Sequence, residues 1–352
     1  MADPVVEGER PTRRQPAARW AWATIALTVG ALAGTPLMAP MGAAAPAAAL
    51  AWFLFVGSSV HVASTAWLFT LPSVRRYARG RPARYLGAPA VLLACGCAAA
   101  VVLTPDVMAW LLLPFFAWQF HHFQKQNLGL VALSASSAGV AGLTCGERRS
   151  ITAAGAFGIG GLLAHPALLQ LDVRPVLGPA FAAAGVGYGV AVTFGALSWG
   201  RRDRHDRVTQ VGALYALALL FPLPIFVFAS PWAAVGGMTI AHGLQYLLLT
   251  GLVALGAPGR DRTPARAAWL CTVAVAGGLL LGVISHLHGA GTVLRGLFGV
   301  YLGLVMTHFV VDADLWRQRD AFPRHLLASR VPWLRPDPTV TLDRLPIDRY
   351  PI

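Results

Sequence analysis

Charged residues are scarce in this chain of 352 residues. They make up 12% of it, against about 25% in an average soluble domain. An intrinsically disordered chain is therefore excluded, because such chains combine high charge with low hydropathy. Lysine is nearly absent, since Lys125 stands alone beside 27 arginines.

Cysteine is also scarce, and no pair has the CxxC spacing that is typical of zinc and redox sites. A disulfide-rich secreted domain is excluded for the same reason. We expect the thiols to act as small packing residues. We find no repeat of 20–50 residues, phosphate-binding loop, dinucleotide-binding motif or Ser-His-Asp signature. The four cysteines are Cys95, Cys97, Cys145 and Cys271.

Apolar residues dominate instead, at 56% of the chain with a mean hydropathy of +0.59. A run of about 20 apolar residues is long enough to cross a bilayer as a helix. The pattern predicts an all-α polytopic membrane bundle, with a turn at Ser230-Pro231 between two long runs. The ten predicted spans are 20–38, 44–71, 85–103, 107–135, 151–171, 176–199, 208–228, 231–257, 267–285 and 291–309.

The basic residues support ten crossings with both termini in the cytoplasm. In that arrangement 25 of the 28 Lys and Arg lie in cytoplasmic segments, as the positive-inside rule requires. The net charge of +13 does not indicate nucleic-acid binding, because the arginines lie in short clusters between apolar runs. We therefore predict a disordered tail over 1–19, one transmembrane domain over 20–316 and a loosely ordered cytoplasmic extension over 317–352.

Histidines occur inside four predicted spans, where ionisable residues are costly and indicate function. They are His61, His121, His122, His242 and His308. With a rise of about 1.5 Å per residue, they lie roughly 12–25 Å from the cytoplasmic helix ends. We expect them to converge on one point.

Polar neighbours strengthen the prediction of a metal site. Asp312 shares a helix face with His308 at the i,i+4 spacing, so it is a candidate sixth ligand. His121 and His122 point about 100° apart, so we expect only one of them to bind the ion. Imidazole and carboxylate without thiolate favour iron, with zinc, manganese or copper as alternatives. We predict that the outer partners, which bind the ligands or the cofactor, are Gln119, Gln126 and Gln245.

Two residues are predicted to act in proton transfer or substrate anchoring, namely Lys125 and Tyr246. Lys125 follows His121 by one helical turn, so we expect it to face the bundle interior and pair with Asp312. The alternative is that Lys125 extends towards the inner headgroups. Outside this set, we expect a surface role for His286 and His288.

A multi-helix membrane protein with intramembrane histidines resembles the bacterial β-carotene 15,15′-dioxygenases of the bacteriorhodopsin-related-protein family. The matching residues are His61, His121 or His122, and His242, with His308 beyond them. The resemblance implies a non-haem iron site held by four histidines and cleavage of a polyene with O₂. We take it as a pointer to metal-dependent oxidation within a bilayer.

The leading hypothesis is an iron-dependent oxygenase or oxidoreductase of the bacterial inner membrane, acting on a hydrophobic small molecule. Its expected partners are the lipid bilayer, O₂ and a redox partner, without nucleic acid. One alternative is a haem-b electron-transfer protein with two axial histidines. A second is a proton-coupled transporter that uses the buried histidines and Lys125. A purely structural membrane subunit is the third.

Overall fold

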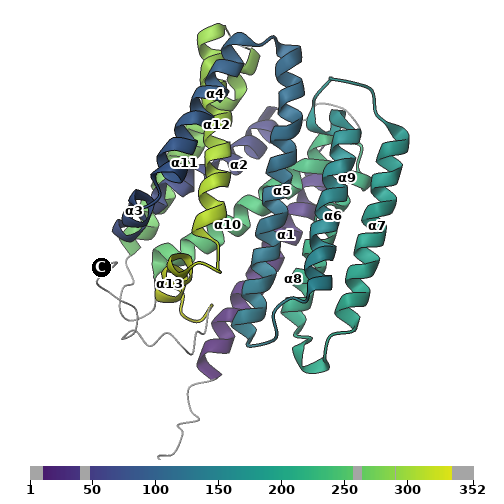
Figure 1. The fold of residues 1–352 in the computed structure, drawn as a ribbon, viewed down its shortest axis with the longest axis vertical. Helices are drawn as coiled ribbons and strands as arrows, with labels where there is room; N and C mark the ends of the chain where they lie inside the picture. The colour runs from purple at the N-terminus through teal and green to yellow at the C-terminus, as the bar shows by residue number, and fades with distance from the viewer. Residues whose placement is uncertain (1–10, 40–47, 257–263, 290, 335–352) are drawn as a thin grey trace, which may run out of the picture.

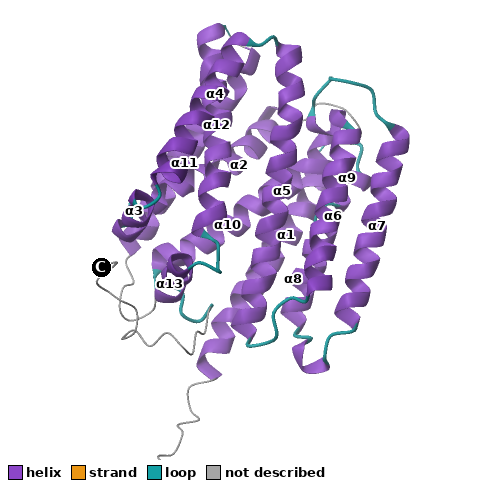
Figure 2. Ribbon diagram, viewed as in Figure 1, coloured by secondary structure: helices purple, strands orange, loops and turns teal. Residues whose placement is uncertain are grey.

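The computed structural model describes residues 11–39, 48–256, 264–289 and 291–334. Within these ranges every regular element is a helix, as predicted, and Figure 2 shows no strand among them. The elements are α1 (Pro11–Met38), α2 (Ala48–Leu68), α3 (Pro72–Arg79), η2 (Ala83–Gly87), α4 (Ala88–Val102), α5 (Pro105–Ala138), α6 (Cys145–Ala164), η3 (Pro166–Leu169), α7 (Gly178–Gly200), η4 (Arg204–Asp206), α8 (Thr209–Leu220), α9 (Leu223–Val227), η5 (Trp232–Gly236), α10 (Gly237–Leu255), α11 (Pro264–Ser285), η6 (His286–Gly289), α12 (Thr292–Leu315) and α13 (Ala321–Arg330).

The long helices lie side by side as one bundle (Figure 1). Helices α4 and α12 pack against each other on one side of it, as do α2 and α11. Helices α6 and α7 form a pair on the opposite side, and α1 packs against α10 between the two sides. The candidate site described below lies where α2, α5, α10 and α12 meet.

Six described helices are long and apolar enough to cross a membrane. By length and composition they indicate an integral membrane protein. They are 15–38, 83–102, 178–200, 232–255, 264–289 and 292–315. The four other predicted spans correspond to α2, α5, α6 and α8, of which α8 has only 12 residues. The total of ten therefore remains a prediction.

Proline divides the long apolar stretch at two places. Proline lacks an N–H and cannot continue a helical hydrogen-bond ladder. The predicted break at Ser230-Pro231 falls between α9 and η5. A further break at Pro222 separates α8 from α9, so 208–228 is not one continuous helix.

Both predicted tails contain helix within the described residues, so those predictions are wrong there. Helix α1 begins at Pro11, inside the segment that we expected to be disordered. Helix α13 lies in the expected C-terminal extension and contacts α10 and α12. Its Leu326 and Leu327 are buried, and this apolar face explains why it packs. Residues 1–10 and 335–352 lie outside the described ranges.

The cysteines do not pack as expected. All four are free. Cys95, Cys145 and Cys271 are exposed on the outer face of the bundle, and only Cys97 is half-buried. An apolar run alone does not tell which helix face meets the core, so sequence reasoning placed them inside.

Glycines allow α4 and α12 to approach closely. A side chain at Gly96 would clash with the Gly299 carbonyl oxygen, and one at Gly299 would clash with the Gly96 carbonyl. Gly303 follows Gly299 at the GxxxG spacing and meets the backbone of Leu92 and Leu93. Small residues at this spacing are typical of membrane helix pairs. The contact fixes α12, which carries His308 and Asp312.

A buried ion pair joins α6 to the segment after α7. Arg202 Nη1 lies 3.0 Å from Glu147 Oε2, and both side chains are buried. Glu147 also forms a capping box with Thr144 at the start of α6. Arg202 donates to the Ala141 carbonyl, whereas the Ala141 N–H donates to Asp206 Oδ1 over 3.0 Å. We call these five residues the Glu147–Arg202 cluster.

Candidate metal centre

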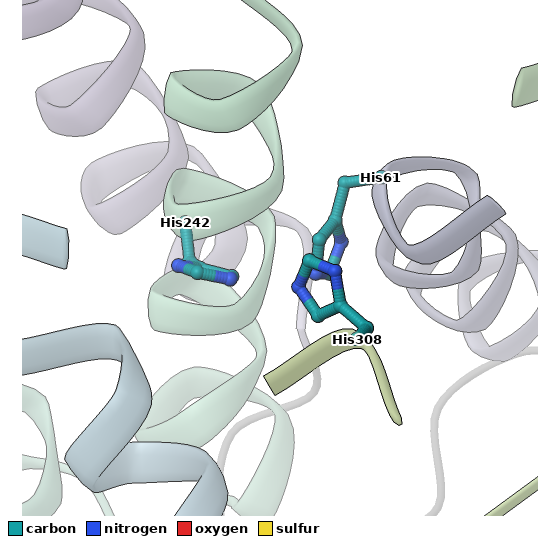
Figure 3. Close-up of side chains that lie close together, drawn as sticks. All are labelled: His61, His242 and His308. Carbon is teal, nitrogen blue, oxygen red and sulfur yellow. The ribbon is translucent and has the colours of Figure 1, made fainter. Parts of the chain in front are cut away.

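Four imidazoles converge near the centre of the bundle, each from a different helix: His61 from α2, His122 from α5, His242 from α10 and His308 from α12. The ring centroids of His61 and His242 are 4.8 Å apart, and those of His61 and His308 are 5.0 Å apart. His122 lies 5.0 Å from His242 and 5.1 Å from His308. Figure 3 shows His61, His242 and His308 pointing towards one another. We call these four residues the histidine cluster.

The histidine cluster contains buried nitrogens without hydrogen-bond partners. They are both ring nitrogens of His61 and of His242, and Nε2 of His122 and of His308. Buried polar atoms are nearly always hydrogen-bonded, so several together are unusual. One ligand atom from each of His61, His242 and His308 lies within 4.8 Å of the other two. Unpartnered imidazole nitrogens at this spacing fit a metal cation.

A carboxylate completes the arrangement. Asp312 lies one turn after His308, and its Oδ2 is 3.6 Å from His308 Nε2. The same oxygen is 3.9 Å from His122 Nε2. One ligand atom from each of these three residues also lies within 4.8 Å of the others. The structure thus brings Asp312 to the point where we expected it.

A hydrogen-bonded chain orients His308 and Asp312. Thr65 Oγ1 lies 2.7 Å from His308 Nδ1 and 3.0 Å from the Tyr246 hydroxyl. Tyr246 donates to Asp312 Oδ1 over 3.0 Å. With Nδ1–H donating to Thr65, His308 presents Nε2 as a lone pair to the cluster.

The sequence analysis did not identify Thr65, and it predicted proton transfer or substrate anchoring for Tyr246. Thr65 follows His61 by one turn of α2, and that spacing is the signal that was available. The structure makes both residues part of the support around His308 and Asp312.

Two predicted residues lie outside the cluster. His121 and Lys125 are exposed on α5, so the prediction that Lys125 faces inward and pairs with Asp312 is wrong. The helical spacing correctly places both on one face, but α5 turns the neighbouring face, with His122, towards the cluster. The described ion pairs of Asp312 involve His122 and His308 only.

Two of the glutamines that we predicted to support the metal ligands form hydrogen bonds between helices and do not bond to imidazole nitrogens. Gln126 donates to the His242 carbonyl over 3.0 Å and to Gln245 Oε1 over 2.9 Å. Gln245 in turn donates to Thr28 Oγ1 and Asn127 Oδ1. These bonds connect α1, α5 and α10 behind the cluster. Gln119 belongs elsewhere, because it lines the cavity described next.

A cavity of about 410 Å³ reaches the histidine cluster at His61. Its volume falls in the range of about 300–1,000 Å³ that is usual for small-molecule sites. Most of its lining is apolar, and half of the lining residues belong to α5 and α12. At the other end it reaches His288 and the half-buried Arg295. His288 is exposed, as predicted, but it also lines the cavity, which the sequence did not indicate.

A second aspartate, Asp314, anchors the C-terminal end of α12. Asp314 accepts hydrogen bonds from Arg81, Arg84 and the Tyr85 hydroxyl at 2.6–2.9 Å. Burial and the Asp314 charge raise the pKa of the nearby Tyr77 to about 12. Asp314 is buried while both arginines are half-exposed. This ion-pair network fixes α12 two residues beyond Asp312.

No protein-family model, curated protein or solved structure matches the chain. The likeness to the β-carotene dioxygenases therefore stays a prediction.

Proposed function

We propose that this protein is an integral membrane metalloenzyme that binds iron in the histidine cluster and oxidises a lipid-soluble substrate with O₂. The observation that carries the proposal is the group of unpartnered, buried imidazole nitrogens at the end of an apolar cavity. If the histidines had only a structural role, nothing would offset the free-energy cost of removing those nitrogens from water.

The donor set favours a single iron ion. Nitrogen and carboxylate donors without thiolate suit non-haem iron. Thr65 occupies His308 Nδ1, so His308 has only Nε2 left for a metal. The two overlapping ligand groups share His308 and are therefore alternative ligand sets for one ion.

Bound ferrous iron with open coordination positions would supply the activation of O₂. The protein's own contribution is to hold the imidazoles on four helices, to fix the His308 tautomer and to exclude water. The apolar cavity would place a hydrophobic molecule beside the ligands. Tyr246 and Thr65 would keep Asp312 in place and connect it to His308 by hydrogen bonds.

The haem-b alternative fits this geometry less well. A porphyrin bound between two of the rings would need the space that the other two rings fill. The transporter alternative would use the same buried histidines as a proton relay, without a bound metal.

We further propose that the bundle lies in a bacterial cytoplasmic membrane with ten crossings and both termini inside. The distribution of arginine supports this orientation. Under it, the Asp314 network faces the cytoplasm, whereas Arg295 and His288 lie near the outer surface.

Elemental analysis of the purified protein tests the metal site. We expect about one iron per chain in the full-length protein, and loss of that iron in His242→Ala and His308→Ala. His121→Ala is the matched control, since it removes an imidazole from the same region of α5 as His122 without touching the cluster. Full iron content in all three variants, or a folded wild-type protein that binds no metal when supplied with ferrous iron, would refute the site.

Nitric oxide tests the proposed use of that iron. It binds ferrous iron at open positions where O₂ would bind, and it gives a characteristic electron paramagnetic resonance signal. We expect this signal in the anaerobic ferrous wild-type protein. Bound iron without a nitrosyl signal would indicate a closed, structural or electron-transfer site.

A further inference from the structure

The two ends of the cavity differ in chemistry. One end meets His61 of the histidine cluster, and the other meets Arg295 and His288. On α12 the lining residues recur every three or four positions, so the cavity follows one face of that helix. Those residues are Arg295, Phe298, the adjacent pair Tyr301 and Leu302, Val305 and Phe309. His308 lies thirteen positions after Arg295, which corresponds to about 20 Å along the helix.

Arg295 is held at the cavity end with donors to spare. It donates from Nη2 to the Leu103 carbonyl over 2.7 Å. Among the residues that the structure describes, Arg295 forms no ion pair with an aspartate or glutamate. A guanidinium carries five N–H donors and binds carboxylate or phosphate in a planar, two-point manner. The remaining donors are therefore suited to an anionic group.

Acidic residues nearby do not line the cavity. Asp106 adjoins the lining residue Pro105, and Asp172 adjoins Leu171, but both are exposed and neither is part of the lining. The charged side chain that the cavity itself presents is Arg295, beside the imidazole of His288.

We infer that the cavity binds an amphiphile with one long apolar chain and an anionic head, carboxylate or phosphate. The head binds Arg295 and His288, and the chain runs along α5 and α12 to the histidine cluster. This inference rests on the proposed function, because it assigns the substrate class of that site. A chain between phenylalanine, leucine and valine side chains is stabilised by burial of apolar surface, and the head stays near the helix ends.

Two probes with the same apolar chain but different head groups show how much the head contributes to binding. The full-length protein in phosphatidylcholine nanodiscs is titrated with tritiated palmitate and with hexadecanol, which lacks the charge. We expect palmitate to bind at least about tenfold more tightly, because hydrogen bonds to charged groups are the stronger ones. Lysophosphatidic acid forms a third arm, and its tighter binding would assign the head as phosphate.

Variants test the anchor. Arg295→Gln should remove the preference for palmitate over hexadecanol while hexadecanol binding stays unchanged. Arg174→Gln is the matched control, since Arg174 also donates to a helix carbonyl, that of Leu163, and does not line the cavity. Val305→Phe should weaken both probes by filling the cavity, and it serves as a second test if Arg295→Gln does not fold.

The result also separates this inference from the proposed function. Equal affinity for palmitate and hexadecanol in the wild-type protein, or a preference that survives Arg295→Gln, overturns the inference. Iron measured in the same samples reports on the metal site independently. Normal iron without a head preference overturns the amphiphile alone, whereas a clear head preference without iron overturns the proposed function alone.

Discussion

The Glu147–Arg202 cluster and the histidine cluster both bury polar groups within one helical bundle, yet they differ in how those groups are satisfied. Arg202 contacts Glu147 and two backbone carbonyls, and Glu147 also accepts from the Thr144 N–H. His242, in contrast, has no partner for either ring nitrogen. The first arrangement is complete within the chain, and the second lacks a partner. A complete cluster stabilises a fold, whereas an incomplete one indicates a ligand.

Breaking the complete cluster should cost the most stability. In Arg202→Met the buried Glu147 carboxylate loses its charged partner, so we expect a loss of about 3–5 kcal/mol in the free energy of unfolding. Denaturant unfolding in detergent measures it. Iron content per folded chain should not change. Adding Glu147→Gln should recover part of the loss, and no recovery would contradict the assigned pairing.

Removing a histidine from the histidine cluster should lower iron affinity strongly and should not lower the stability of the metal-free protein. His242→Leu should weaken iron binding by at least about 100-fold, more than the 10–100-fold typical of an outer partner. The metal-free form should gain about 1 kcal/mol of stability, because two buried unpartnered nitrogens are removed. Metal titration and metal-free unfolding measure the two effects. A large loss of metal-free stability would show that His242 is a packing residue instead.

Removing the support around His308 should have an intermediate effect. Thr65→Val preserves shape but removes the partner of His308 Nδ1, so we expect iron affinity to fall about 10–100-fold. Thr24→Val is the matched control, since Thr24 is also buried and its hydroxyl donates to the Trp20 carbonyl of its own helix. Equal affinity in both variants would remove Thr65 from the site.

The smallest effects are expected on the outer face of α5. His121→Ala and Lys125→Met should change the free energy of unfolding by less than about 0.5 kcal/mol, because both residues are exposed. Iron content should stay at the wild-type level. The adjacent His122→Ala should lower it, so two neighbouring histidines give opposite results. Iron loss in Lys125→Met would restore the pairing with Asp312 that the structure contradicts.

The sequence was sufficient to find the histidines, since imidazoles inside apolar runs are conspicuous. It also indicated Asp312, because a residue one turn from His308 shares its helix face. The sequence could not show which face of α5 turns inward, and for that reason it could not separate His121 from His122. The error over Lys125 followed from the same unknown rotation of one helix.

Other features depend on tertiary packing and leave little trace in a pattern of residues. Leu302 and Val305 line a cavity, but lipid-facing residues of a membrane helix have the same composition. Thr65 matters only because α2, α10 and α12 meet at its hydroxyl. The helical nature of α13 was hidden by the arginines and prolines around it.

The course of the cavity along α12 has a consequence for selectivity. A head fixed at Arg295 lies a set number of helical turns from His308, so the bundle would measure distance along a chain. The atom presented to the cluster would then be chosen by counting from the head, whatever functional group the chain carries there. Chains of different length would be distinguished by whether they reach the cluster, and the distance from Arg295 to His308 along α12 would set the required length.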